Sequence, residues 1–218
     1  MKRLMAATAI GLAFGGASGS ANAATLGPQR TGETETYRLT STETSARGTW
    51  MTTATFRVTR VDGTTLEIAD TRDPRNTLRF DRLPDGELAP RPGPLGDFIY
   101  AYNQTVAALE AATARRSSPL AWRIGPPGAT IPATVRIDSD GGQVAVTGSG
   151  PLEGPPPPPF GRPGPMPPPQ PPHVSVELAI RVAAERVTSA HSEEQLEITL
   201  PRPQHIAHSW SLEAVGPA

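Results

Sequence analysis

The chain has 218 residues with a single lysine, no cysteine and a formal net charge of −1. This length suits one domain, and the near-neutral charge argues against non-specific binding to nucleic acid or anionic lipid. Without cysteine the chain has no disulfides, no thiolate metal ligands and no thiol nucleophile.

Residues 1–23 have the three parts of a secretory signal peptide. Lys2 and Arg3 form a basic start, a short apolar stretch follows, and Ala21-Asn22-Ala23 supplies the small residues before a cleavage point. We therefore expect cleavage after Ala23 and a periplasmic or secreted protein of the bacterial cell envelope. Losing Lys2 and Arg3 takes the net charge to −3. No later apolar run reaches the length of a transmembrane helix, so we expect no transmembrane segment after cleavage.

The segment 24–34 is polar, and we expect it to be a flexible leader. Alternation of apolar and polar residues then begins and continues to residue 149. Between residues 48 and 61, Trp50, Phe56 and Val58 share one face while the other face is polar. Such a period of two is typical of antiparallel strands wetted on one side. Asp62-Gly63 predicts a hairpin turn. The pattern recurs in three short pairs: Tyr37 and Leu39, Leu66 and Ile68, Leu78 and Phe80.

Residues from about 95 to 115 are predicted to form the one long helix. Their apolar residues fall on a single stripe, as helical periodicity requires. Asp97 lies in the first turn, where the helix dipole favours an acid. Ser117-Ser118-Pro119 is expected to end the helix. The stripe consists of Leu95, Phe98, Ile99, Tyr102, Val106 and Leu109.

Further strands are predicted after the helix, by rows of alternating apolar residues at 131–137, 144–146, 196–200 and 206–212. Residues 174–188 are ambiguous, because they alternate like a strand but space Glu177, Arg181 and Glu185 like a helix face. Their β-branched content favours a strand with a bulge between Val182 and Val187. The polar run from Ser189 to Glu194 is interpreted as a loose turn.

The segment 151–172 contains 13 prolines in 22 positions. Proline has no N–H, so we expect this tract to stay out of the sheet as a disordered, polyproline-rich loop. A second reading is a docking segment for an envelope partner. Its possible contact residues are then Phe160, Arg162 and Met166.

Together these elements predict an α+β fold: a curved, mostly antiparallel meander sheet of about nine strands, half-barrel or barrel-like, packed on one long helix. One helix cannot cover so many strands, so part of the apolar face must be filled by side chains or left as a cavity. This strand order and single signal resemble the LolA-like class of periplasmic lipid and lipoprotein carriers. That resemblance implies an incomplete barrel around a helical plug, and it carries over no individual residues.

Searches of the sequence for reaction chemistry give no catalytic, cofactor or metal residues. There is no Gly-x-Ser-x-Gly, no nucleotide-binding glycine loop and no zinc-binding histidine pair. His205 and His208 are three residues apart in an expected strand, so they face opposite sides. A hydrolase would need serine, histidine and acidic side chains to converge from distant segments.

We therefore expect a non-enzymatic protein that binds an apolar ligand, such as a lipid or acyl chain, or an envelope partner. The first alternative is a structural or interaction protein of the envelope that uses the proline-rich tract, and the second is a hydrolase with a non-contiguous site. A cavity of about 300 Å³ or more between the sheet and the helix would favour ligand binding, whereas a filled core there would leave the structural or interaction protein. The aromatic residues expected to line the cavity or fill the core are Trp50, Phe56, Phe98, Tyr102 and Trp210.

Overall fold

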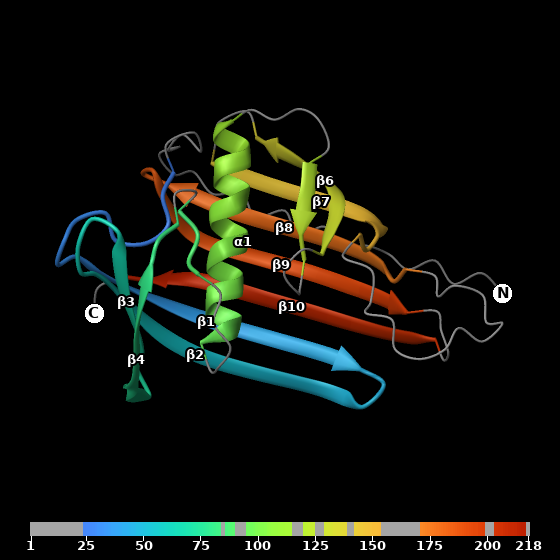
Figure 1. Ribbon diagram of the computed structural model, residues 1–218, viewed down its shortest axis with the longest axis horizontal. Coiled ribbons are helices and arrows are strands. Elements are labelled where there is room, and N and C mark those ends of the chain that lie inside the picture. Colours follow the sequence, from blue (N-terminus) through green and yellow to red (C-terminus); the bar gives the residue numbers. More distant parts are fainter. Residues whose placement is uncertain are drawn as a thin grey trace, which may run out of the picture.

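The computed structural model describes residues 24–83, 86–89, 95–114, 120–124, 129–138, 142–153, 171–198 and 203–216. In these ranges, ten strands form one open antiparallel sheet, and one helix crosses its concave face (Figure 1). The helix is α1 (Gly96–Thr113). The strands are β1 (Thr34–Ser45), β2 (Gly48–Arg60), β3 (Thr65–Asp70), β4 (Asp73–Asp81), β5 (Leu120–Arg123), β6 (Thr130–Ile137), β7 (Gln143–Pro151), β8 (His173–Ala183), β9 (Arg186–Ile198) and β10 (Gln204–Val215).

The strand order is β4-β3-β2-β1-β10-β9-β8-β7-β6-β5. Two meanders therefore meet where β1 pairs with β10, and α1 carries the chain from one edge strand, β4, to the other, β5. The expected class of fold is confirmed, with ten strands in place of about nine in the described ranges. The sheet is not closed, which excludes the full-barrel form of the prediction.

The sheet curves around α1. In Figure 1 the middle strands run across the view, whereas β3, β4 and β6 run almost along the helix on either side of it. The right-hand ends of β1, β2, β9 and β10 extend past α1. The helix consequently covers one part of the concave face and leaves the ends of these four strands uncovered by it.

The core lies between α1 and the part of the sheet beneath it. The expected apolar stripe of the helix faces the sheet, with Phe98 and Tyr102 fully buried. The Phe98 ring lies 4.6 Å from the ring of Phe56 and 6.2 Å from that of Tyr37, measured between centroids. The alternation expected in 48–61 is confirmed from Ala54 onward, since Ala54, Phe56 and Val58 are buried while their neighbours on the strand are more exposed, but residues 48–53 are exposed on both faces.

Residues 174–188 form strands, as the β-branched content indicated, but they belong to two strands joined by a tight turn. Ala184 and Glu185 make this turn with φ angles of 48° and 62°. The β8–β9 register also shifts next to Val182. The turn expected from Ser189 to Glu194 is wrong: this run lies inside β9. Its polar residues Ser192 and Glu194 lie on the concave face, directly across from Trp210 and His208 of β10.

Two further segments are more ordered than the sequence suggested. The segment 24–34, expected as a flexible leader, packs along the body: Leu26 is buried, the Thr25 amide donates to the Glu185 carbonyl at 2.9 Å, and Thr34 already belongs to β1. Pro151 was expected to lie outside the sheet, because proline has no N–H. It is instead the last residue of β7 and pairs with His173. A strand end tolerates proline because its ladder bond can be omitted there.

Candidate functional site

The candidate site lies where the concave face continues beyond α1. We call this region the open end and define it by the concave-face residues Glu43, Ser45, Trp50, Leu196 and Ile206. It contains a hollow of about 380 Å³ beside the β1–β2 turn and the start of β10. The hollow is lined by Glu43, Ser45, Ala46, Arg47, Trp50, Gln204, His205 and Ile206.

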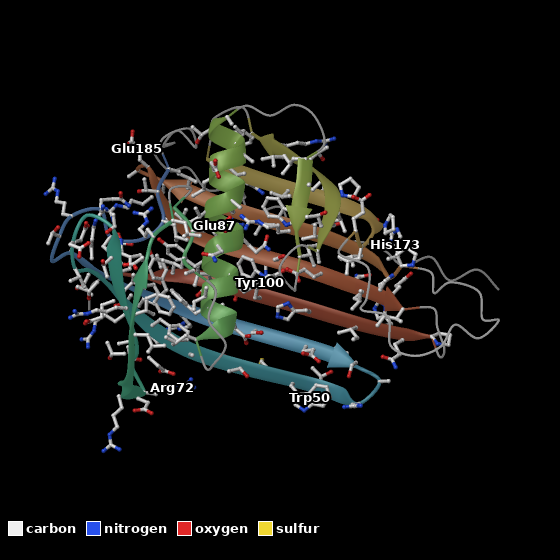
Figure 2. The ribbon with its side chains drawn as sticks, in the orientation of Figure 1. Trp50, Arg72, Glu87, Tyr100, His173 and Glu185 are labelled. Atoms are coloured by element: carbon white, nitrogen blue, oxygen red, sulfur yellow. The ribbon has the colours of Figure 1, made fainter. Side chains whose placement is uncertain are left out.

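Trp50 is the main apolar residue of the hollow. It remains 50% exposed, although its strand position places it on the same face as the buried Phe56. Its neighbour Met51 is 72% exposed and lies on the opposite, convex face. Leu196 and Ile206 face each other across β9 and β10 and are half-buried. The open end therefore continues the concave face beyond the helix, with Trp50, Leu196 and Ile206 as its apolar residues. Figure 2 shows Trp50 well to the side of α1.

A cluster of four polar side chains lies between the core and the hollow. The Ser41 Oγ and the His208 Nε2 are 3.2 Å apart, and the His208 Nδ1 is 3.4 Å from the Glu194 Oε2. The Tyr100 hydroxyl donates to the other Glu194 oxygen, Oε1, at 2.9 Å. The Tyr100 ring also lies against the His208 ring, with 6.2 Å between centroids. We call Ser41, Tyr100, Glu194 and His208 the polar cluster.

Strand register brings the cluster together. His208 lies directly across from Glu194 on one side and from Glu43 on the other. Residues paired in this way project from the same face of a sheet. Ser41 is two residues before Glu43 on β1, so it shares that face. Tyr100 reaches the cluster from α1, on the side of the helix toward the open end (Figure 2).

Glu43 connects the two parts of the site, since it lines the hollow and is the ladder partner of His208. Ile206 makes a second connection, two residues before His208 on β10. The cluster therefore borders the hollow directly.

Burial and nearby charges both act on the pKa of His208. Its side chain is 29% exposed, and that of Glu194 is 11% exposed. The hydrogen bond to Glu194 raises the pKa of His208 above its ordinary value, against the opposing effect of burial. The charges of Glu194, Asp97 and Glu43 raise this pKa further. His208 can accordingly act as a base when neutral or as a cation paired with Glu194 when protonated.

One buried donor beside the cluster has no partner. Trp210 is 2% exposed, and its indole Nε1 makes no hydrogen bond. Trp210 lies directly across from Ser41 on β1 and from Ser192 on β9. A buried N–H without an acceptor is destabilising, and the indole N–H of Trp122, also in the core, is in the same state.

The aromatic residues selected from sequence divide into two groups. Phe56, Phe98, Tyr102 and Trp210 are buried in the core. Trp50 is the member of the set that lines the hollow. The expected partner contacts Phe160, Arg162 and Met166 lie outside the described residues.

Sequence reasoning missed Ser41, Glu194 and His208 as a group. Ser41 and His208 are 167 positions apart, and only the β1–β10 pairing joins them. The polar run from Ser189 to Glu194 is a usable signal for these residues, although by sequence alone it predicts a turn.

Within the described ranges, no helix is both long and apolar enough to cross a membrane. In the same residues, no group of three or more histidine, cysteine or acidic side chains could hold a metal ion.

Comparison with known proteins gives distant likenesses. No family model matches the chain, and no curated protein does. Among solved structures, 87% of the chain is similar to a part of lipovitellin, in a study of its lipid–protein interactions, with a TM-score of 0.47 and 11% identity. The chain spans only 26% of that protein's length.

Two smaller proteins are similar over 88% of their own lengths. One is an S-type phycobiliprotein lyase from Guillardia theta, which aligns with 84% of the chain at a TM-score of 0.28 and 4% identity. The other is a LolA superfamily protein from Nitrosomonas europaea, which aligns with 86% of the chain at a TM-score of 0.24 and 9% identity. The function proposed below rests on this chain's own residues.

Proposed function

We propose that the protein binds the apolar chain of a lipid-like ligand at the open end of its sheet. The observation that carries this proposal is the hollow of about 380 Å³ lined by the half-exposed Trp50. Small-molecule sites are commonly concave, largely apolar and a few hundred Å³ in volume. Trp50 and Ile206, which line the hollow, project from the concave face that forms the core, so a bound chain would extend that core.

The ligand is expected to enter from the strand ends, where α1 does not cover the sheet. Trp50 would contact it from β2 and Ile206 from β10, with Leu196 continuing the apolar surface on β9. The proposal includes an envelope location, because the sequence of residues 1–23, outside the described ranges, has the pattern expected of an export signal.

The test uses N-phenyl-1-naphthylamine, an uncharged apolar dye that fluoresces when it leaves water. Trp50→Ala should weaken dye binding about tenfold, equivalent to ~1.4 kcal/mol. Met51→Ala is the matched control, because Met51 is the next residue and lies on the convex face; its Kd should stay within about twofold.

Displacement of the dye by a fatty acyl ester would then establish that the site accepts acyl chains. The proposal would lose its basis if the wild type did not bind the dye, or if Trp50→Ala and Met51→Ala lost the same amount of affinity for it. Native mass spectrometry of protein isolated from its host gives an independent test through co-purified lipid.

A further inference from the structure

We propose that the polar cluster hydrolyses acyl esters, with Ser41 as nucleophile, His208 as general base and Glu194 as the acid that orients His208. This activity goes beyond ligand binding, and it rests on the proposed function because the hollow would hold the acyl chain. The cluster meets the condition set by the sequence for a hydrolase, namely convergence of serine, histidine and an acid from distant segments.

The atoms are connected in the order that such catalysis requires. In serine hydrolases the nucleophile bonds to Nε2 of the histidine, and the acid bonds to Nδ1. Here Ser41 Oγ lies 3.2 Å from Nε2, and Glu194 Oε2 lies 3.4 Å from Nδ1. These contacts are at the long end of the hydrogen-bond range, as is common for catalytic contacts before substrate binds.

Glu194 is itself held in place. Its second oxygen accepts the Tyr100 hydroxyl at 2.9 Å, and its side chain is 11% exposed. Tyr100 therefore holds the Glu194 carboxylate, which in turn orients the His208 imidazole. Tyr100 is thus a positioning residue. A general base needs such orientation because proton transfer depends strongly on geometry.

The substrate carbonyl would lie between the hollow and Ser41. Glu43 lines the hollow, and Ser41 is two residues along the same strand on the same face. An acyl chain in the hollow, against Trp50, would thus direct its ester group toward the polar cluster.

Trp210 offers a donor for the charge that develops on the carbonyl oxygen. Its indole N–H is buried without a partner, and Trp210 is the ladder partner of Ser41. Side chains paired in this way have Cβ atoms about 5 Å apart. A bound ester oxygen would supply the acceptor that this N–H lacks, which is the role of an oxyanion-hole donor.

The reaction is an ordinary two-step acyl transfer. Ser41 Oγ attacks the carbonyl carbon while its proton passes to His208 Nε2. The bond from carbon to the alcohol oxygen then breaks, and the alcohol leaves with that proton, so that the acyl group is esterified to Ser41. Water attacks this ester, giving one proton to His208. The carboxylic acid departs, and the proton returns to Ser41 Oγ.

The rate should rise with pH, because only neutral His208 can accept the serine proton. The groups that face His208 are Glu43 from β1, Glu194 from β9, and Asp97 and Tyr100 from α1. The three acids favour the protonated imidazole, so the midpoint of the pH–rate profile should lie above the ordinary value for histidine, about 6.5.

The experiment measures hydrolysis of p-nitrophenyl butyrate by the chain from Ala24 onward, together with labelling by a fluorophosphonate probe. The wild type should turn over, and the probe should attach to Ser41, as located by peptide mass spectrometry. Ser41→Ala and His208→Ala should each lower kcat/KM by about 100-fold or more. Glu194→Gln should lower the rate and change the pH profile.

Ser209→Ala is the matched control, since Ser209 adjoins His208 on the opposite face, and its rate should equal that of the wild type. Binding of N-phenyl-1-naphthylamine by Ser41→Ala shows that this variant is folded. If the dye binds but wild type and Ser41→Ala hydrolyse equally, the catalytic proposal is overturned and ligand binding stands. If the probe labels a different residue, the assignment of Ser41 is likewise overturned. If the wild type neither binds the dye nor hydrolyses the ester, both proposals fail.

Discussion

Replacing Phe98 by alanine should destabilise the protein strongly, because Phe98 joins α1 to the sheet. The side chain has no exposed surface and lies against three other aromatic rings. The ring centroids of Phe56, Tyr102 and Tyr37 lie 4.6, 6.1 and 6.2 Å away. Replacing a buried phenylalanine by alanine lowers the free energy of unfolding by about 3–5 kcal/mol. The lost ring contacts place Phe98→Ala toward the upper end of that range.

For a domain of this size, that loss corresponds to a fall in Tm of about 10 °C or more. Circular dichroism during heating measures Tm, and urea titration gives the free energy of unfolding. Trp50→Ala is the comparison, because Trp50 is larger than Phe98 but half-exposed. It should cost about 1 kcal/mol or less. Equal losses of stability in the two variants would refute the distinction between a packed core and an open end.

Three further predictions concern other parts of the molecule. A Cβ on Gly148 would lie 2.8 Å from the Ala133 Cβ, so Gly148→Ala should lower the free energy of unfolding by about 1–3 kcal/mol; Gly142→Ala, whose nearest neighbour is 3.8 Å away, should change it by less than about 0.5 kcal/mol. Because the pKa of His208 is raised on folding, its stabilising effect is complete below the ordinary histidine pKa and is lost as the pH rises through the raised value. Urea titrations should therefore show the stability difference between wild type and His208→Gln shrinking from about pH 5 to about pH 9, and a growing difference would contradict this sign. Replacing residues 154–170 by a short Gly-Ser linker should leave Tm almost unchanged, because the Leu152 amide already donates to the Pro172 carbonyl at 2.7 Å and the loop ends are adjacent. A fall of more than about 5 °C would show that the tract packs onto the fold.

Much of the fold follows from local patterns. The alternation around Phe56 and the helical stripe around Phe98 each need only one segment to be read, and both are observed. The turn at Ala184 and Glu185 was not predictable in this way, since neither residue is a usual occupant of a left-handed turn. Glycine or asparagine there would have identified the hairpin.

The site could not be predicted because it depends on how far α1 reaches across the sheet. Trp50 and Trp210 have the same alternating environment in sequence, yet one is 50% exposed and the other 2%. Similarly, the polar side chains of Ser192 and Glu194 give this part of β9 the sequence pattern of a turn. A polar residue on the inner face of a strand indicates a site only when its partner is known. The partner of Glu194 is Tyr100, which lies 94 positions away in the sequence.

The pairing of β1 with β10 has a consequence for how the chain reaches its native state. These strands adjoin at the middle of the sheet, although they are the first and last strands in sequence order. The two meanders can each form from local contacts, but a long-range ladder must join them, and such contacts slow folding. Until β10 docks, β1 and β9 each present an unpaired edge, the kind of surface at which strands of separate molecules associate. Aggregation during refolding should therefore be governed by the arrival of the final strand.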